Sequence, residues 1–545
     1  MILKNKCFWA AVLSFSMFFS FVANLLCKAE QNEYEEKKKQ ILIIADNIWS
    51  SVGVAFSKPN IEVVNKKIDV NDVSTLISFN PKTSIIRVGV EFFDFCMEEG
   101  EAAFAIVLAH EMGHYFNMHR SFSDVSGYMM TDNEKQIVKD NISSKDLDKM
   151  KELETQADLF AMFHCYSAGY DIDDVWPGIL EKIYTLAKNP EDRYLDLEQR
   201  KVIINIVRSN YEHLLPLISI SKYLFLISEH ELNAEIFSYI IDNNYTSWDM
   251  FFNAGVSYLN AATLAMEQQD SLYIPLLIIN NNEKSEISEN YSIKRSLNPD
   301  HPGREDYINS MIAQSMLKFN YLVQMYPDLM MPYIFISILY YLDNDLKLAR
   351  NYAIKAKELA SNKFEKNISH TVLGIIYSKL DKELALKELK EAEGFDIADK
   401  NIDILRNGDS KNIKIPSDEK REMEYIDSVN AINYFKIIEK NLPTSYKYSE
   451  LDNIRIEEYE FNRYNIYKIS NNYGNCAIIE TSSDYDLPSA RGINRGDDQD
   501  ALVKAYGHPD KISFYNNNKY YKYLKNNIIF EINNNKVTNW MIYDI

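Results

Sequence analysis

Two histidines and one glutamate stand at a spacing that suits metal-dependent hydrolysis. The segment His110-Glu111-Met112-Gly113-His114 lies in a stretch of good helix formers. On an α-helix, residues four apart share one face, so both imidazoles can bind a single metal ion. Zinc takes imidazole ligands, and an adjacent glutamate can accept a proton from the attacking water. The segment therefore predicts a zinc site with His110 and His114 as ligands and Glu111 as the general base.

The third zinc ligand must come from another element, because a catalytic zinc usually takes three protein ligands and leaves one position for water. A histidine six residues after His114 would complete one known pattern, but Arg120 stands there. Glu154 is the better candidate. Asp158, one helical turn later, can accept the remaining N–H of a ligand histidine and orient its ring. The alternative for these two acids, taken alone, is a solvated helix face. We expect one zinc ion per chain.

These two segments together resemble a known family. The histidine segment followed by Glu154-Thr155-Gln156-Ala157-Asp158 is similar to the gluzincin family of CAAX prenyl proteases, HtpX and BepA-like peptidases, whose signature is HExxH followed on a later helix by ExxxD. The resemblance implies an α+β zincin-type peptidase domain over residues 30–205. It implies the same roles for the residues already named, and an edge strand at Ser84–Phe92 that could pair with a substrate strand.

A further segment, Asn189-Pro190-Glu191-Asp192-Arg193, is similar to the family's later His-Pro…Arg segment, with Asn189 in place of the usual histidine. Arg193 is therefore a candidate for supporting the substrate or its oxyanion. The alternative is a surface arginine at the start of a helix.

Hydrophobic patterning predicts the elements that would position these residues. The predicted elements before residue 206 are a helix at Glu33–Ile48, strands at Ile61–Val64, Leu76–Phe79 and Ser84–Phe92, a helix at Glu101–Arg120, a surface loop at Ser121–Ser144 and a helix from Ser144 onward. They place the histidine segment and Glu154 on two different helices.

Residues 206–445 are predicted to form a helical solenoid. Two segments repeat at tetratricopeptide spacing, with small residues such as Ala349, Ala353 and Gly374 where paired helices approach closely. A generic helical array is the alternative. Either arrangement offers a surface for protein or peptide contacts. Polar residues 280–305 are predicted to be an insertion between repeats.

Residues 446–545 are predicted to form a small α+β unit. One helix is predicted at Asp498–Tyr506. The short β-like runs on either side of it are Ile466–Ile469, Ala477–Glu480, Lys519–Leu524, Ile528–Ile532 and Val537–Tyr543. The segments Ser489–Ile493 and Ala505–Asp510 resemble the small lipoprotein-type domain of SmpA/OmlA and the β-lactamase-inhibitor proteins, which are mostly binding modules. The overall expectation is a mainly α, multidomain protein.

The N-terminus predicts export. Lys4 and Lys6 precede an apolar stretch that ends at Cys27-Lys28-Ala29, which is typical of a signal peptide over residues 1–29. An uncleaved anchor helix and lipid attachment at Cys27 are alternatives. No later segment is long enough to span a bilayer, so we expect no transmembrane helix in the mature chain. The periplasm or cell envelope is the expected location.

Composition limits the function further. The 545 residues carry a formal charge of −20, which argues against non-specific nucleic-acid binding because that needs lysine and arginine to displace counterions. Only 16 glycines and 14 prolines are present, which favours a helical protein. We expect an exported zinc endopeptidase acting on envelope or misfolded proteins in quality control, with repeats that recruit substrate or an envelope complex. The alternative is a non-enzymatic periplasmic chaperone or adaptor with a vestigial zinc site.

Overall fold

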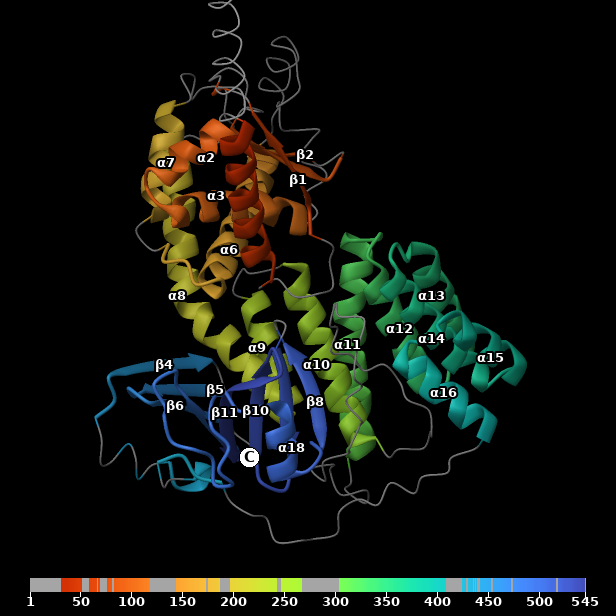
Figure 1. Cartoon of the computed structure of the whole chain (residues 1–545). Helices are drawn as coiled ribbons and strands as arrows, with labels where there is room; N and C mark the ends of the chain where they lie inside the picture. The colour runs from red at the N-terminus through yellow and green to blue at the C-terminus, as the bar shows by residue number, and fades with distance from the viewer. Residues whose placement is uncertain are drawn as a thin grey trace, which may run out of the picture. The chain divides into compact units, whose positions relative to one another are not determined.

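The chain forms two compact units, one of Met1–Val52 and Ser57–Tyr211 and the other of Gly53–Phe56 and Glu212–Ile545. The computed structural model is mainly helical, with a separate β-sheet region toward the C-terminus (Figure 1). The residues that it describes are 31–50, 58–65, 67–68, 76–80, 83–117, 144–172, 175–186, 197–242, 247–266, 303–407, 424–427, 430–434, 436, 438, 442–451, 454–471, 474–515 and 518–544. The predicted signal peptide, Cys27, the predicted loop after residue 120 and most of the insertion at 280–305 lie outside these ranges.

The first unit combines a three-stranded sheet with helices. In the sheet, β3 (Ile85–Gly89) lies between β1 (Asn60–Val64), to which it is parallel, and β2 (Ile77–Asn80), to which it is antiparallel. The helices are one over residues 31–50, α2 (Val90–Met97), α3 (Glu101–Phe116), α6 (Ser144–Ser167), α7 (Val175–Leu186) and the first part of α8 (Leu197–Ile227). The helical assignments of the histidine segment and of Glu154 are thereby confirmed.

The prediction of an edge strand at Ser84–Phe92 is wrong in two respects. The strand ends at Gly89, and Val90 begins α2. Phe92, Phe93 and Cys96 are buried at helical spacing on α2, so packing of one helical face overrides the β propensity of this stretch. β3 is also the central strand of its sheet, and both of its edges are already paired. Its two neighbours, β1 and β2, are the edge strands of the described sheet.

α3 and α6 form the packed centre of the first unit. Gly100, with φ of 105°, precedes α3 in a conformation that favours glycine. From Ala103 to Ala109 every residue of α3 is buried, as expected for a helix that is apolar on all sides. On α6, Ala157 and Leu159–Ala161 are fully buried as well. This core fixes the two helices that carry the histidines and Glu154.

The second unit begins with helices that pack in consecutive pairs. They are α9 (His230–Asp242), α10 (Trp248–Ala265), α11 (Arg304–Met325), α12 (Met330–Leu342), α13 (Leu346–Leu359), α14 (Lys363–Ser378), α15 (Lys382–Glu391) and α16 (Asp396–Asn407). The small residues singled out in the sequence lie in these contacts. Ala349 and Ala353 are fully buried on α13, and a Cβ on Gly374 would lie 2.5 Å from Leu389 Cγ on α15. The tetratricopeptide identity of the repeats stays a prediction, and α8 runs without interruption across the predicted boundary at residue 205.

The C-terminal region is an eight-stranded antiparallel sheet in the order β4-β5-β6-β7-β11-β10-β9-β8. The strands are β4 (Ser445–Leu451), β5 (Ile454–Glu460), β6 (Tyr464–Asn471), β7 (Gly474–Thr481), β8 (Lys511–Tyr515), β9 (Asn518–Tyr523), β10 (Ile528–Asn533) and β11 (Lys536–Asp544). One face carries a hydrophobic core that includes Leu502 and Tyr506 of α18 (Gln499–Tyr506). The other face contacts α8, because the Tyr223 hydroxyl donates to the buried Glu480 carboxylate on β7.

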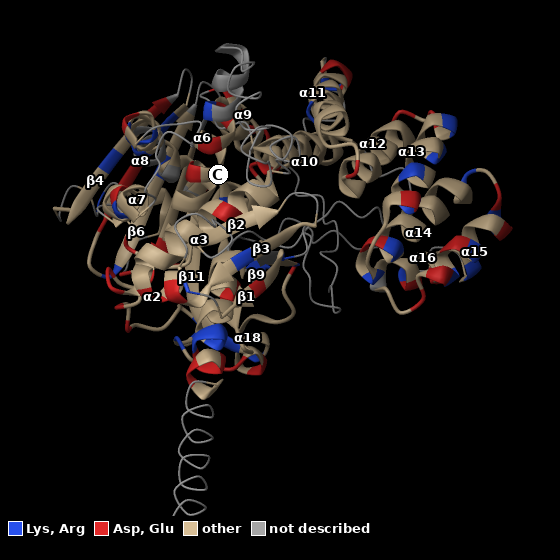
Figure 2. Cartoon of the chain, turned by 90° about the horizontal axis from the view of Figure 1, so that it is seen from above, with Lys and Arg blue, Asp and Glu red and all other residues tan. Residues whose placement is uncertain are grey.

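Charges of both signs are interspersed on the second unit. In the view of Figure 2, lysine or arginine and aspartate or glutamate alternate along α13 to α16. This mixture differs from the basic stripe that tracks a nucleic-acid backbone. Within the described ranges, the helices are all too short or too polar to cross a bilayer. Among the described residues, Cys96, Cys165 and Cys476 are buried and form no disulfide.

Candidate metal centre

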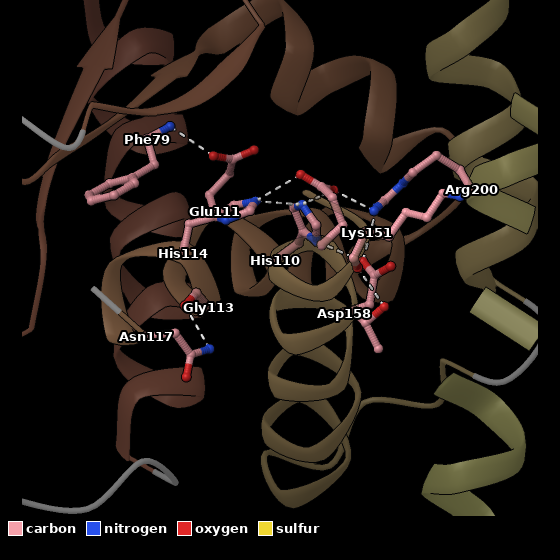
Figure 3. A network of polar contacts seen from close by, with 11 residues as sticks. Phe79, His110, Glu111, Gly113, His114, Asn117, Lys151, Asp158 and Arg200 are labelled. Carbon is pink, nitrogen blue, oxygen red and sulfur yellow. Dashed lines mark hydrogen bonds and ion pairs between the residues drawn. The ribbon is translucent and has the colours of Figure 1, made fainter. Parts of the chain in front are cut away.

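Three side chains from two helices bring donor atoms to one point. His110 and His114 lie one turn apart on α3 (Figure 3), and Glu154 belongs to α6. Their ligand atoms all lie within 4.8 Å of one another. The two Nε2 atoms are 3.1 Å apart. Oε2 of Glu154 lies 3.5 Å from Nε2 of His110, and its other oxygen, Oε1, lies 3.5 Å from Nε2 of His114. The predicted ligand set is therefore brought together.

These separations suit a small tetrahedral ion. Bonds of ~2.0–2.1 Å at tetrahedral angles place donor atoms roughly 3.3–3.4 Å apart. The observed 3.1 Å and 3.5 Å edges lie close to that value without rearrangement. Two imidazoles and one carboxylate favour zinc over the oxygen-preferring calcium and magnesium. The residues present thus fit a zinc ion with one coordination position left for water.

Asp158 orients the first histidine. Its Oδ1 lies 2.7 Å from Nδ1 of His110, and its side chain is fully buried. A carboxylate on Nδ1 fixes the tautomer in which Nε2 carries the lone pair that a metal needs. The supporting role predicted for Asp158 matches this contact.

Arg200 is the residue that the sequence analysis missed. It extends from α8 and donates to Glu154 Oε2 and, at 3.0 Å, to Asp158 Oδ1. Only 4% of Arg200 is exposed, so it neutralises two acids in a dry environment. Arg193, the predicted arginine, lies outside the described residues.

A sequence signal for Arg200 does exist. Arg200, Ile203, Ile204 and Val207 follow the spacing of one helical face, and all four are buried. A charged residue on an apolar helix face is almost never buried without a partner. The position of Arg200 therefore indicates an ion pair with an acidic residue on another element.

Burial and neighbouring charges give the carboxylates of Glu154 and Glu111 different pKa values. Burial alone would raise the pKa of Glu154, but Arg200 and the two histidines lower it well below its ordinary value. Burial raises the pKa of Glu111 to about 7, against smaller lowering effects of His110 and of the Phe79 N–H. A carboxylate with a pKa near neutrality is suited to take and return a proton. Glu154 is thus suited to be a ligand, and Glu111 to be a base.

Glu111 also contacts the open edge of the small sheet. The backbone N–H of Phe79 donates to Glu111 Oε2 at 2.7 Å (Figure 3). Phe79 lies on β2, which pairs with β3 on one side and is the last strand of the described sheet on the other. The base therefore lies beside the edge of β2 that faces away from β3, where no further strand is paired among the described residues.

Gly113 allows the two helices to approach closely enough to form the site. A Cβ at this position would lie 2.9 Å from both Cα and O of Ala157, which are backbone atoms. Asn117 then donates to the Gly113 carbonyl at 3.0 Å. The glycine inside the histidine segment and the alanine before Asp158 are thus explained by helix packing.

Replacing Gly113 with Ala should push α6 away from α3. We expect a loss of roughly 1–3 kcal/mol in unfolding free energy and weaker zinc binding, because Glu154 moves with α6. Thermal unfolding and zinc titration measure both. Gly178→Ala on α7 is the matched control, since a Cβ there meets nothing within 4 Å. Equal stability of the two variants would contradict the close-contact explanation.

Comparison with models of known protein families and with curated protein sequences gives no match. The resemblance to the gluzincin peptidases therefore depends on the motif residues alone.

Proposed function

We propose that this chain is a zinc-dependent endopeptidase that hydrolyses peptide bonds through His110, His114 and Glu154 as ligands and Glu111 as the base. One observation carries the proposal. The donor atoms, a glutamate with a pKa near neutrality and the outer edge of β2 all lie together in the first unit. A structural zinc site is normally closed by four protein ligands and needs no base.

In the proposed hydrolysis, the zinc ion and the protein side chains would have different roles. A zinc ion in this site would supply a Lewis acid that polarises the scissile carbonyl and lowers the pKa of water. Glu111 takes the proton from the attacking water at its carboxylate and passes it to the leaving amine. Asp158 holds His110 in the required tautomer, and Arg200 holds the carboxylates of Glu154 and Asp158 in place through ion pairs.

The substrate would be an extended segment of protein. The Phe79 N–H on β2 points away from β3 toward Glu111, so a peptide paired with this edge would present its backbone to the base. The helices of the second unit would recruit misfolded or envelope proteins, or an envelope complex. We also propose that the chain is exported, as its N-terminal residues suggest.

Removal and return of zinc tests the proposal. Dialysis of the full chain against a chelator should abolish cleavage of an unfolded protein such as casein, and added zinc should restore it. Cleavage that persists in the chelator would overturn the proposal. A protein that binds zinc stoichiometrically and cleaves no unfolded protein would favour the alternative, a chaperone or adaptor.

A further inference from the structure

A second cluster of charged side chains lies in the other unit, on β8, β9 and the start of α9. Lys511 on β8 and Lys522 on β9 are directly opposite each other in the antiparallel register, so both side chains leave the same face. Like charges in directly opposed positions destabilise a sheet. Lys522 is only 1% exposed, which makes the repulsion harder for water to screen.

The hydrogen bonds of the Lys522 side chain show which part of the chain lies next to the lysine pair. Its ammonium donates to the Leu226 carbonyl at 3.1 Å and to Ser228 Oγ at 3.4 Å. These acceptors lie at the end of α8, and α9 begins two residues later at His230. The lysine pair therefore lies beside the N-terminus of a 13-residue helix, where unpaired backbone N–H groups and the helix dipole attract anions.

The side chain of His230 is a second, independent indication that a hydrogen-bonding ligand binds here. It is 5% exposed, and its Nδ1 has no hydrogen-bond partner among the described residues. The ring packs against Phe225, with centroids 5.5 Å apart, and stands at the first position of α9, where side chains tilt toward the helix N-terminus. The charges of Lys511 and Lys522, after burial itself, lower the pKa of His230.

Two acids lie near the lysine pair. Asp510 accepts the backbone N–H of Leu524 at 2.7 Å. The charges of Glu229 and Asp510 raise the pKa of Lys522, but burial and the charge of Lys511 lower it well below its ordinary value. Lys511 pairs with β9 through its backbone, but its side chain forms no ion pair or hydrogen bond among the described residues, and burial lowers its pKa to about 8. Two lysines and a histidine thus collect in a chain whose net charge is −20.

We propose that Lys511, Lys522 and His230, together with the N-terminus of α9, form a binding site for a small phosphate-class dianion. The dianion accepts hydrogen bonds from the Lys511 ammonium, from the third proton of Lys522 and from His230 Nδ1–H. Charge-assisted hydrogen bonds of this kind are about twice as strong as neutral ones. The bound anion removes the repulsion between the opposed lysines and fixes β8 and β9 against α9.

Calorimetric titration of the full chain with inorganic phosphate, at constant ionic strength, tests the site. We expect one phosphate per chain, and a rise in Tm of about 3 °C once phosphate reaches roughly ten times its Kd. Lys511→Met should weaken binding by about 10-fold or more, whereas Lys511→Arg should retain it. Lys504→Met on α18, an exposed lysine, is the matched control and should bind as the wild type does.

The titration also separates this site from the metal centre. Phosphate binding should persist in His114→Ala, so the site does not depend on the proposed peptidase function. Binding that is lost in His114→Ala and kept in Lys511→Met would overturn the site. Absence of binding to the wild type would overturn it as well. In chloride without phosphate, Lys511→Met should unfold at an equal or higher Tm, because it removes the like-charge pair; a lower Tm would contradict the proposal.

Discussion

Replacing Glu111 with Gln is expected to lower the rate of peptide-bond cleavage by roughly 10²–10⁴-fold, the usual contribution of a general base. The amide has nearly the same shape as the carboxylate and can keep the hydrogen bond from the Phe79 N–H, but it cannot take a proton from water. Zinc content should stay unchanged, because Glu111 is not one of the three residues whose donor atoms converge. Initial cleavage rates on an unfolded protein and metal analysis of the same sample provide the measurement.

The control for this variant is Glu98→Gln, which changes an exposed glutamate at the end of α2 and should leave the rate unchanged. Cleavage by Glu111→Gln at the wild-type rate would contradict the base assignment. Loss of zinc together with activity would also contradict it, because Glu111 would then act by holding the metal. Since the variant should still bind substrate, it can also be used to capture natural targets.

Replacing Arg200 with Met is expected to destabilise the metal-free protein by about 3–5 kcal/mol, the usual cost of removing one partner of a buried ion pair. Arg200 contacts the carboxylates of both Glu154 and Asp158, and Asp158 is fully buried. A zinc ion bound by Glu154 supplies positive charge at the same place. Added zinc should therefore raise the Tm of Arg200→Met by more than it raises that of the wild type.

Thermal unfolding in chelator and in zinc measures both parts of this prediction. Lys201→Met is the matched control on the same helix. Its ion pairs to Glu181 and Glu198 are long, at 3.9 Å and 3.5 Å, and exposed pairs contribute at most about 1 kcal/mol. If Arg200→Met were as stable in chelator as Lys201→Met, Arg200 would not be the partner of the two acids.

Much of the candidate site could be predicted from sequence because its geometry follows from helix periodicity. His110 and His114 needed only a helix to share a face, and Glu154 and Asp158 needed only a second one. Arg200 could not be found by the same means, because its contact joins elements more than 40 residues apart. Its position on a buried helix face was a local signal that such a partner was needed.

The sheets were harder to predict than the helices. In Ser84–Phe92, β-branched residues continue from β3 into α2, so local propensity does not mark the boundary. β4, β5 and β8 were not predicted at all. β5, with Ile454 and Ile456 buried around exposed Arg455, follows the period of two, but its charged and tyrosine residues hid the pattern. Pairing with distant strands, which local sequence does not encode, stabilises these segments.

The zinc content of the purified full chain tests the central claim most directly. We expect about one zinc ion per chain in the wild type, as for a three-ligand catalytic site. We also expect near-total loss of that zinc in Glu154→Gln, with full retention in Glu98→Gln. A wild-type protein that holds no zinc, or a Glu154→Gln variant that holds as much as the wild type, would contradict it.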